Sequence, residues 1–150
     1  MKKFQLPRGM RDIDSDEFVR REYVFERMKS VLIKYGFDFV EPSLIENFEP
    51  LAAKSGKEIE KEIYLFKDKA GRKIALRFDL TVGMARMIAR KKLAKPLRLA
   101  CISNMFRYEE PQYGRYRSFW QWDAEIFGCG IEADAEIISL LCDILDEFKI

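Results

Sequence analysis

Histidine is absent from this sequence of 150 residues, and its absence excludes several kinds of enzyme site. Ser-His-Asp and Cys-His nucleophilic catalysis need an imidazole base, and nearly all catalytic zinc sites use histidine ligands. Cysteine is also scarce, because Cys101, Cys129 and Cys142 are widely spaced and form no Cys-x-x-Cys pair. The sequence therefore predicts no structural metal site. We expect the three thiols to be reduced and mostly buried, as in a cytosolic protein.

Long apolar runs and an excess of one charge are missing as well. No run approaches the ~18 apolar residues of a membrane-spanning helix, and no apolar stretch follows the two lysines near the start, so neither a membrane span nor a signal peptide is predicted. The 27 basic and 25 acidic residues give a net charge of +2, which does not by itself indicate nucleic-acid binding. With 48% hydrophobic residues and no repeat or linker, we expect one globular domain without an internal boundary.

Hydrophobic periodicity predicts an α+β fold, with an antiparallel sheet flanked by helices. The first helix is expected to begin at a cap formed by Asp14 or Ser15 and to end near Tyr35, and the last helix is expected over 132–150. Between them the pattern predicts a strand over 37–41, a hairpin of 62–68 and 72–79, a helix over 80–92, and strands over 97–102, 104–108 and 117–127.

Each terminal helix carries an apolar stripe that we expect to face the core. The first stripe contains Phe18, Phe25, Met28, Leu32 and Tyr35. The second contains Ile137, Leu140, Leu141, Ile144, Leu145 and Phe148.

The predicted strand over 117–127 has an apolar face and a mixed face. Its even positions, from Ser118 through Trp120 to Ile126, are expected in the core. The odd positions form the mixed face, which consists of Arg117, Phe119, Gln121, Asp123, Glu125 and Phe127. Three hydrogen-bonding side chains on this face, at 121, 123 and 125, lie between its two phenylalanines. This mixed face is either the solvated side of an antiparallel sheet or the floor of a ligand pocket, which needs aromatic walls and a few polar groups.

Three arginines, Arg107, Arg115 and Arg117, lie in or beside the predicted loop over 109–116. Guanidinium groups make permanently charged, bidentate contacts with phosphates, and a phenylalanine face can stack on a planar base, so this combination indicates nucleotide binding. Two other interpretations remain open. Interleaved Tyr and Arg could bind a single-stranded nucleic acid directly. Carboxylates such as Glu109 and Glu125 could form a glycosidase pair, which leaves the arginines unused.

The stretch 128–133, Gly-Cys-Gly-Ile-Glu-Ala, matches the spelling of a dinucleotide-binding fingerprint, G-x-G-x-x-A. The strand before it alternates polar and apolar residues, whereas a parallel core strand is apolar on both faces. We therefore interpret these glycines as a turn into the last helix.

Four segments match the motifs of one enzyme family in the order that the family has them. They are 6–12 (Leu-Pro-Arg-Gly-Met-Arg-Asp), the helix ending at Gly36 with 37–42, 76–81 (Leu-Arg-Phe-Asp-Leu-Thr), and 106–109 with 114–121 (Phe-Arg-Tyr-Glu, then Gly-Arg-Tyr-Arg-Ser-Phe-Trp-Gln). The chain thereby resembles the class II aminoacyl-tRNA synthetases in their histidyl version. The first segment resembles the opening of these enzymes, the second motif 1, the third the segment that binds the substrate amine, and the last motif 2.

The resemblance implies a class II catalytic core with about six antiparallel strands, of which 1–150 is the N-terminal part with motifs 1 and 2. Motif 3, a second catalytic arginine and the anticodon-binding domain of the family lie outside this stretch. It also implies a cytoplasmic homodimer that contacts its partner through the motif 1 region, with Pro42 at the interface. The implied reaction uses ATP and Mg²⁺ to convert histidine into histidyl-adenylate, and then transfers the histidyl group to tRNA(His).

The resemblance assigns ATP to four residues by position. Arg107, the catalytic residue, would bind the α-phosphate, and Glu109 would lie on the adenine side. Arg115 would reach the terminal phosphates, and Phe119 would stack on adenine. Guanidinium groups on phosphates agree with the chemistry of the residues themselves.

The resemblance assigns histidine to four other residues. Asp79, Thr81 and Gln121 would hold the substrate ammonium, and Glu125 would bind the imidazole. An imidazole N–H can donate to a carboxylate, whereas an aliphatic substrate would leave a buried charge unpaired. Glu125 is therefore expected to select histidine.

A second function belongs to the same resemblance: a catalytically silent relative that binds histidine as the regulatory subunit of an ATP phosphoribosyltransferase in histidine biosynthesis. Such paralogues tend to lose ATP-binding residues, so the four residues assigned to ATP favour the synthetase. One position departs from the family, because Glu110 stands where members often carry arginine. We expect the 150-residue chain alone to have weak or no activity.

Overall fold

The computed structural model describes residues 4–91 and 94–150, which divide into two compact units. The first unit is built from Met1–Asp12, Pro42–Met87 and Ser103–Gln121, and the second from Ile13–Glu41, Ile88–Ile102 and Trp122–Ile150. The chain passes between the units several times. Neither unit is a continuous stretch of sequence, which explains why composition and linker signals predicted no boundary.

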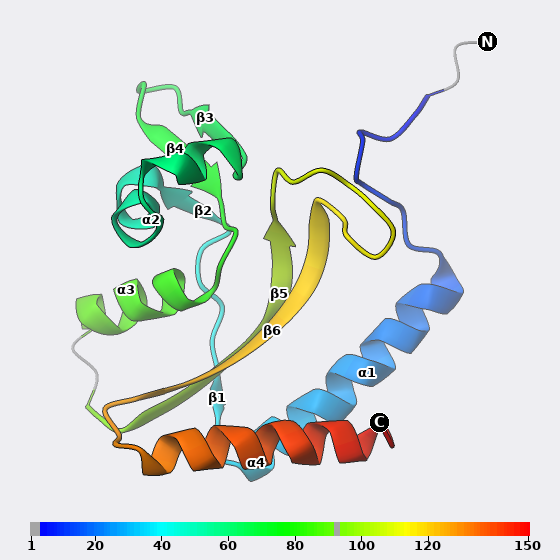
Figure 1. Cartoon of the computed structure of the whole chain (residues 1–150), viewed down its shortest axis with the longest axis vertical. Helices are drawn as coiled ribbons and strands as arrows, with labels where there is room; N and C mark the ends of the chain where they lie inside the picture. Colours follow the sequence, from blue (N-terminus) through cyan, green and yellow to red (C-terminus); the bar gives the residue numbers. More distant parts are fainter. Residues whose placement is uncertain (1–3, 92–93) are drawn as a thin grey trace. The chain divides into compact units, whose positions relative to one another are not determined.

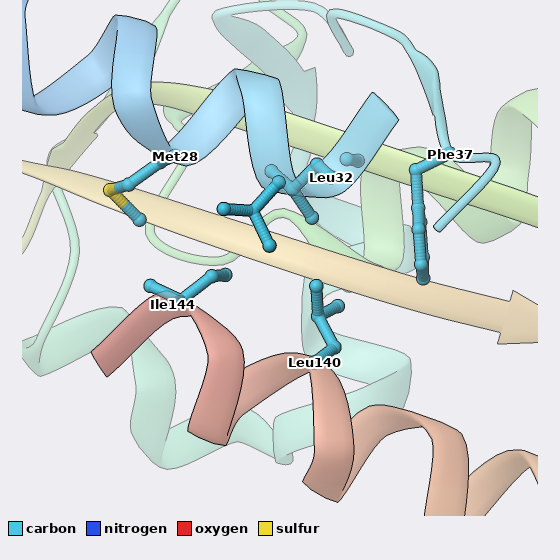
Figure 2. Packing of buried hydrophobic residues seen from close by; sticks show 7 residues of the cluster. Met28, Leu32, Phe37, Leu140 and Ile144 are labelled. Carbon is cyan, nitrogen blue, oxygen red and sulfur yellow. The ribbon is translucent and has the colours of Figure 1, made fainter. Parts of the chain in front are cut away.

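The core of the second unit lies between its two long helices, α1 (Ser15–Lys34) and α4 (Glu132–Glu147). As predicted, α1 begins at a cap, where the Asp14 carboxylate accepts a hydrogen bond of 2.8 Å from the Glu17 amide. Figure 2 shows side chains of both helices meeting between them, together with Phe37. The buried residues of this core are Met28, Val31, Leu32, Phe37, Ala100, Leu140 and Ile144.

Three strands, β1 (Asp38–Phe39), β5 (Leu97–Phe106) and β6 (Ser118–Phe127), form a sheet in the order β1-β5-β6. In Figure 1, β5 and β6 run side by side in opposite directions, as the predicted antiparallel sheet requires. The pairing of β1 with β5 is parallel, with Asp38 opposite Leu99, so this sheet is mixed at its β1 edge.

The strand β5 also corrects the predicted break between 102 and 104. Ser103 lies in neither predicted strand, yet it continues β5 and is only 2% exposed. A buried hydroxyl must find a hydrogen-bond partner, and here the Arg77 guanidinium donates to Ser103 Oγ. The polar residue therefore does not interrupt the strand.

A second sheet, in the first unit, has the antiparallel order β2-β4-β3, made of β2 (Ile45–Asn47), β4 (Lys73–Leu76) and β3 (Leu65–Lys67). The hairpin of β3 and β4 confirms the predicted turn, where the Asp68 carboxylate accepts from the amides of Ala70 and Arg72, both at 2.9 Å. The core of this unit consists of Phe48, Leu51, Ile59, Ile63 and Ala75.

Three helical segments accompany this sheet, and the sequence predicted one of them. The helix α3 (Thr81–Lys91) confirms the prediction over 80–92 up to Lys91; position 92 lies outside the described residues. The helix α2 (Phe48–Ser55) and the 3-10 helix η1 (Lys57–Lys61) were not predicted. The glycines at 128 and 130 form the turn between β6 and α4, as predicted. Across the described ranges, the helices lack the combination of length and apolar character that crossing a membrane demands.

Burial differs from the prediction at several apolar positions. Phe18 on α1 is 49% exposed, and Leu141 and Leu145 on α4 are 45% and 39% exposed. Adjacent helical residues point about 100° apart, so a stripe that includes both Leu140 and Leu141 is wider than the face that packs. Trp120, expected in the core, is 41% exposed. Cys101 is buried, but Cys129 and Cys142 are exposed, so the expectation of mostly buried thiols is wrong for two of the three.

Candidate functional site

Arg107 follows the end of β5 and contacts several of the residues that the sequence placed in one site. Its guanidinium donates from Nε to the Phe78 carbonyl and from Nη2 to Oε1 of Gln121, both at 3.2 Å. Its Cζ also lies 5.0 Å from the centre of the Phe119 ring. Because Phe78 and two residues of β6 hold this half-buried side chain, its charge is fixed in place before any ligand arrives.

The loop after Arg107 forms a pocket of about 360 Å³ in the first unit. Glu109 and Arg115 make an ion pair across this pocket, with Nε and Oε2 2.9 Å apart. The Arg115 side chain is 58% exposed, so the pair contributes little to stability and serves mainly to aim the guanidinium. The lining residues include all four that were assigned to ATP: Arg107, Glu109, Gly114, Arg115, Tyr116, Phe119 and Trp120.

A second pocket, of about 400 Å³, shares Arg107 and Glu109 with the first. Its other lining residues are Glu58, Ile59, Glu62, Phe78 and Asp79. Three carboxylates beyond Glu109 make this pocket suited to a cationic group such as an ammonium. Asp79 also caps α3, because its Oδ1 accepts from the Val82 amide at 3.2 Å.

Sequence reasoning assigned no role to several lining residues, among them Glu58, Glu62 and Trp120. Glu58 lies in η1, an element that hydrophobic periodicity did not predict. Glu62 was assigned to a strand, and it reaches the site because its carbonyl accepts from the Tyr108 amide at 2.7 Å. Trp120 was assigned to the core by alternation along β6. Its exposure next to Phe119 shows that the core-facing side of β6 begins only after this position, at Trp122.

Three residues assigned to histidine are not among those lining the two pockets: Thr81, Gln121 and Glu125. Gln121 meets the site through its hydrogen bond with Arg107. Thr81 is the first residue of α3, two positions after Asp79, and is half-buried. Glu125 lies on β6 in the second unit, half-buried, four residues after Gln121 and on the same face by strand alternation. Their binding roles stay predictions.

Arg77 is a buried arginine, 4% exposed, to which the sequence assigned no role. It donates from Nε to the Asn104 carbonyl at 3.0 Å and from Nη1 to the Pro42 carbonyl at 2.7 Å. Pro42 itself is buried, and a Cβ at Gly83 would lie 2.6 Å from its ring. The proline that was expected at a dimer interface is therefore already covered within this chain.

Comparison with known proteins matches 9–150 to a family model described as histidyl-tRNA synthetase. A histidine–tRNA ligase of Methanocaldococcus jannaschii is 43% identical over 143 residues, which cover 93% of this chain and 34% of that protein. One from Pyrococcus abyssi is 45% identical over 139 residues, covering 91% of this chain and 32% of that protein. The chain spans about a third of the length of the curated relatives that it matches.

Solved structures with a similar fold include one from Bacillus halodurans C described as an ATP phosphoribosyltransferase regulatory subunit/histidyl-tRNA synthetase. It has a TM-score of 0.84 and 30% identity, over 98% of this chain and 39% of that one. Apo histidyl-tRNA synthetase of S. aureus has a TM-score of 0.81 and 24% identity, over 97% of this chain and 35% of that one, which shows a likeness of fold alone.

Proposed function

The chain belongs to the histidyl-tRNA synthetase family, and from this membership we propose that it binds ATP and histidine for the activation of histidine. The full reaction proposed is that of a histidine–tRNA ligase. Histidine and ATP form histidyl-adenylate, and the histidyl group then passes to tRNA(His). The 150 residues form the N-terminal part of a class II catalytic domain, carrying motifs 1 and 2.

The observation that carries this proposal is the grouping of Arg107, Glu109, Arg115 and Phe119 around one pocket of about 360 Å³. Two guanidinium groups supply the charge that a triphosphate needs, and the aromatic ring supplies a stacking surface for a purine. Arg107 takes the α-phosphate, Arg115 the terminal phosphates and Phe119 the adenine. The glycosidase interpretation has less support, because it leaves both arginines without a ligand.

Histidine occupies the adjoining pocket in this proposal. Asp79 and Gln121 accept hydrogen bonds from the substrate ammonium, and Thr81 at the start of α3 completes this group. The neighbouring carboxylates Glu58 and Glu62 favour a cation at the same place. Glu125 receives the imidazole and selects histidine over aliphatic amino acids.

The proposed chemistry requires no nucleophile from the protein, so the lack of histidine in the chain is no obstacle. The substrate carboxylate attacks the α-phosphorus, a bond forms between the two, and the bond to the β-phosphate oxygen breaks with release of pyrophosphate. Arg107 stabilises the charge that develops on the α-phosphate, and the two pockets hold the reactants in line.

Mg²⁺ supplies further charge neutralisation when it is bound with the nucleotide. The described residues contain no group of three carboxylate or thiol side chains able to hold a metal ion. Protein sites for Mg²⁺ usually combine one or two carboxylates with substrate phosphates, so the ion would be held mainly by the phosphates of ATP.

The remaining parts of the proposal concern the assembled enzyme. We propose weak or no turnover for the 150-residue chain alone, because it spans about a third of its relatives. The homodimer through the motif 1 region and the cytoplasmic location are proposals on the same basis.

The test is calorimetric titration of the chain with ATP and with histidine, for the unaltered protein and for Arg107→Ala. We expect Arg107→Ala to lose ATP binding while its melting temperature without ligand falls little. Arg72→Ala is the matched control, because Arg72 is 74% exposed in the β3–β4 hairpin and pairs with Asp68 instead. Equal ATP affinity for Arg107→Ala and Arg72→Ala would contradict the nucleotide assignment.

The second candidate function is that of the regulatory subunit of an ATP phosphoribosyltransferase. The similar structure from Bacillus halodurans C supports this candidate, because that protein is described both as such a subunit and as a histidyl-tRNA synthetase. A ligand that binds the folded chain but not the unfolded chain raises the melting temperature of the protein. Stabilisation by both ATP and histidine supports the synthetase. Stabilisation by histidine without ATP supports the regulator, and no stabilisation by either indicates a scaffold without these ligands.

A further inference from the structure

The N-terminal segment, residues 7–11, lies against the loop that carries Glu109 and Arg115, and the proposed chemistry leaves it without a role. Three contacts join the two. The Gly9 carbonyl accepts a hydrogen bond of 2.9 Å from the Arg117 amide. The Arg11 guanidinium lies 4.8 Å from the centre of the Tyr116 ring, and Arg8 forms an ion pair with Glu110.

At Gly9 the backbone of the segment lies tightly against Pro111 and Arg117. A Cβ at this position would lie 2.8 Å from both Pro111 Cγ and Arg117 Cγ, nearer than real Cβ contacts come. Its φ of +79° also lies in the left-handed region, which favours glycine. Any other residue here would push the segment and the loop apart.

Arg117 transmits this contact to the nucleotide pocket. Its carbonyl accepts from the Arg107 amide at 3.0 Å, and its Nε donates to the Glu109 carbonyl at 2.8 Å. Its guanidinium also lies 4.1 Å from the centre of the Tyr108 ring. One residue therefore contacts Gly9 on one side and two pocket residues, Arg107 and Glu109, on the other.

We infer that the N-terminal segment is a positioning element for the nucleotide pocket, with Gly9 as its positioning residue. Gly9 holds the backbone of Arg117, and Arg117 holds Arg107 and Glu109 at the distances that the triphosphate requires. The inference rests on the proposed function, because it concerns the same ATP pocket. It predicts that ATP affinity depends on a residue that is not among those lining the pocket.

The contact between the N-terminal segment and the loop also explains why position 110 carries a glutamate. Both partners of the Arg8–Glu110 pair are about 70% exposed, so the pair adds little to overall stability. Its effect is local, because it ties the root of the loop to the N-terminal segment. The acidic residue that lowers positive charge beside the phosphates is thus the partner of Arg8.

The experiment compares Gly9→Ala with Gly71→Ala in the 150-residue chain. Gly71 has a φ of +83°, so alanine carries a similar backbone strain there, but no atom lies within 4 Å of its Cβ position. Dissociation constants for ATP and for histidine are measured separately by calorimetry. We expect Gly9→Ala to weaken ATP binding about 10-fold or more and histidine binding by a smaller factor. A displaced loop misplaces Arg115 together with Arg107 and Glu109, whereas the histidine pocket shares only the last two. Gly71→Ala should change neither.

Limited trypsin digestion supplies a readout that needs no ligand. Cleavage after Arg115, identified by mass spectrometry, should be faster in Gly9→Ala than in Gly71→Ala, since the loop is less firmly held. If the unaltered chain does not bind ATP, the proposed function fails, and the cleavage comparison still decides the positioning role. Equal cleavage in the two variants would overturn it.

Two further outcomes also decide the matter. Equal weakening of ATP and histidine binding by Gly9→Ala would mean a general structural role and would overturn the inference. If Gly9→Ala does not fold, Arg11→Ala takes its place, since it removes the guanidinium from the Tyr116 ring and leaves the Gly9 backbone intact. ATP affinity and loop cleavage unchanged in Arg11→Ala would then count against the positioning role.

Discussion

The Arg107 guanidinium donates a hydrogen bond of 3.2 Å from Nη2 to Oε1 of Gln121, and so joins two residues that we assign to different substrates. Arg107 is assigned to the α-phosphate of ATP and Gln121 to the ammonium of histidine. The amide oxygen of glutamine has two lone pairs, so it can accept from an ammonium while it accepts from Arg107. Reacting atoms must approach to about 3–3.5 Å, and under the proposed assignment the bond between the two residues places the two substrate sites next to each other.

The first prediction concerns Gln121 itself. Gln121→Leu removes the acceptor shared by Arg107 and the ammonium, and we expect histidine binding to weaken by about 1.5–3 kcal/mol, the value of a hydrogen bond to a charged group. Gln121→Glu keeps an acceptor oxygen at that position and should retain histidine binding. Calorimetry with histidine measures both. Unchanged affinity in Gln121→Leu would remove Gln121 from the proposed site.

The second prediction separates the two parts of ATP at Phe119. Phe119→Ala removes the stacking surface and should weaken ATP binding by about 1–3 kcal/mol, the range measured for a base on an aromatic side chain. Inorganic tripolyphosphate has no base, so its affinity should change little. Phe119→Tyr keeps the ring and serves as the control. Equal losses for ATP and tripolyphosphate would mean that the ring acts by holding Arg107, which lies 5.0 Å from its centre.

Local signals were enough to predict the elements whose cause is local. The side chain of Asp14 caps α1, and the Asp68 carboxylate closes the β3–β4 turn with nearby amides, so both elements were predicted near their observed positions. The alternation along β6 was also correct at Trp122, Ala124 and Ile126, which pack on the core of the second unit.

Features that depend on distant contacts could not be predicted in this way. Ser103 stays in β5 because Arg77, far away in the sequence, supplies its hydrogen bond. Glu58 lines the candidate site from a short 3-10 helix that has no hydrophobic period to signal it. The sequence motif was sufficient to assign four residues to ATP. The pocket that they share is formed by tertiary structure, so its shape could not be predicted from the motif.

The third prediction tests the core of the second unit with two adjacent leucines on α4. Leu140 is 1% exposed and packs against α1, whereas Leu141 is 45% exposed (Figure 2 shows Leu140). Leu140→Ala should lower the free energy of unfolding by about 2–5 kcal/mol, since it removes buried methyl groups and leaves a cavity. Leu141→Ala should change it by less than about 0.5 kcal/mol. Urea denaturation measures both, and equal losses would mean that α4 packs through a different face.

The last prediction concerns pH and the contact between the two long helices of the second unit. The Tyr35 hydroxyl donates to Oδ2 of Asp143 at 2.6 Å, and this hydrogen bond is the main cause that raises the pKa of Tyr35 from 10.0 to about 12. The hydroxyl must keep its proton to donate, so the folded chain holds the proton more tightly than the unfolded chain does. The stabilisation is fully present below pH 10.0, the unfolded value, and is lost as the pH rises towards about 12.

The variants Tyr35→Phe and Asp143→Asn test this contact independently. The difference in unfolding free energy between the unaltered chain and Tyr35→Phe should be constant below pH 10.0 and shrink above it, while other alkaline effects cancel in the comparison. The pKa of Tyr35 is measured from tyrosinate absorbance, after subtraction of the absorbance of Tyr35→Phe. In Asp143→Asn this pKa should fall back towards 10.0, because the carboxylate that accepts the hydrogen bond from the Tyr35 hydroxyl is gone. A stability difference that grew with pH would contradict the assignment, because it would mean that the folded chain favours the ionised tyrosine.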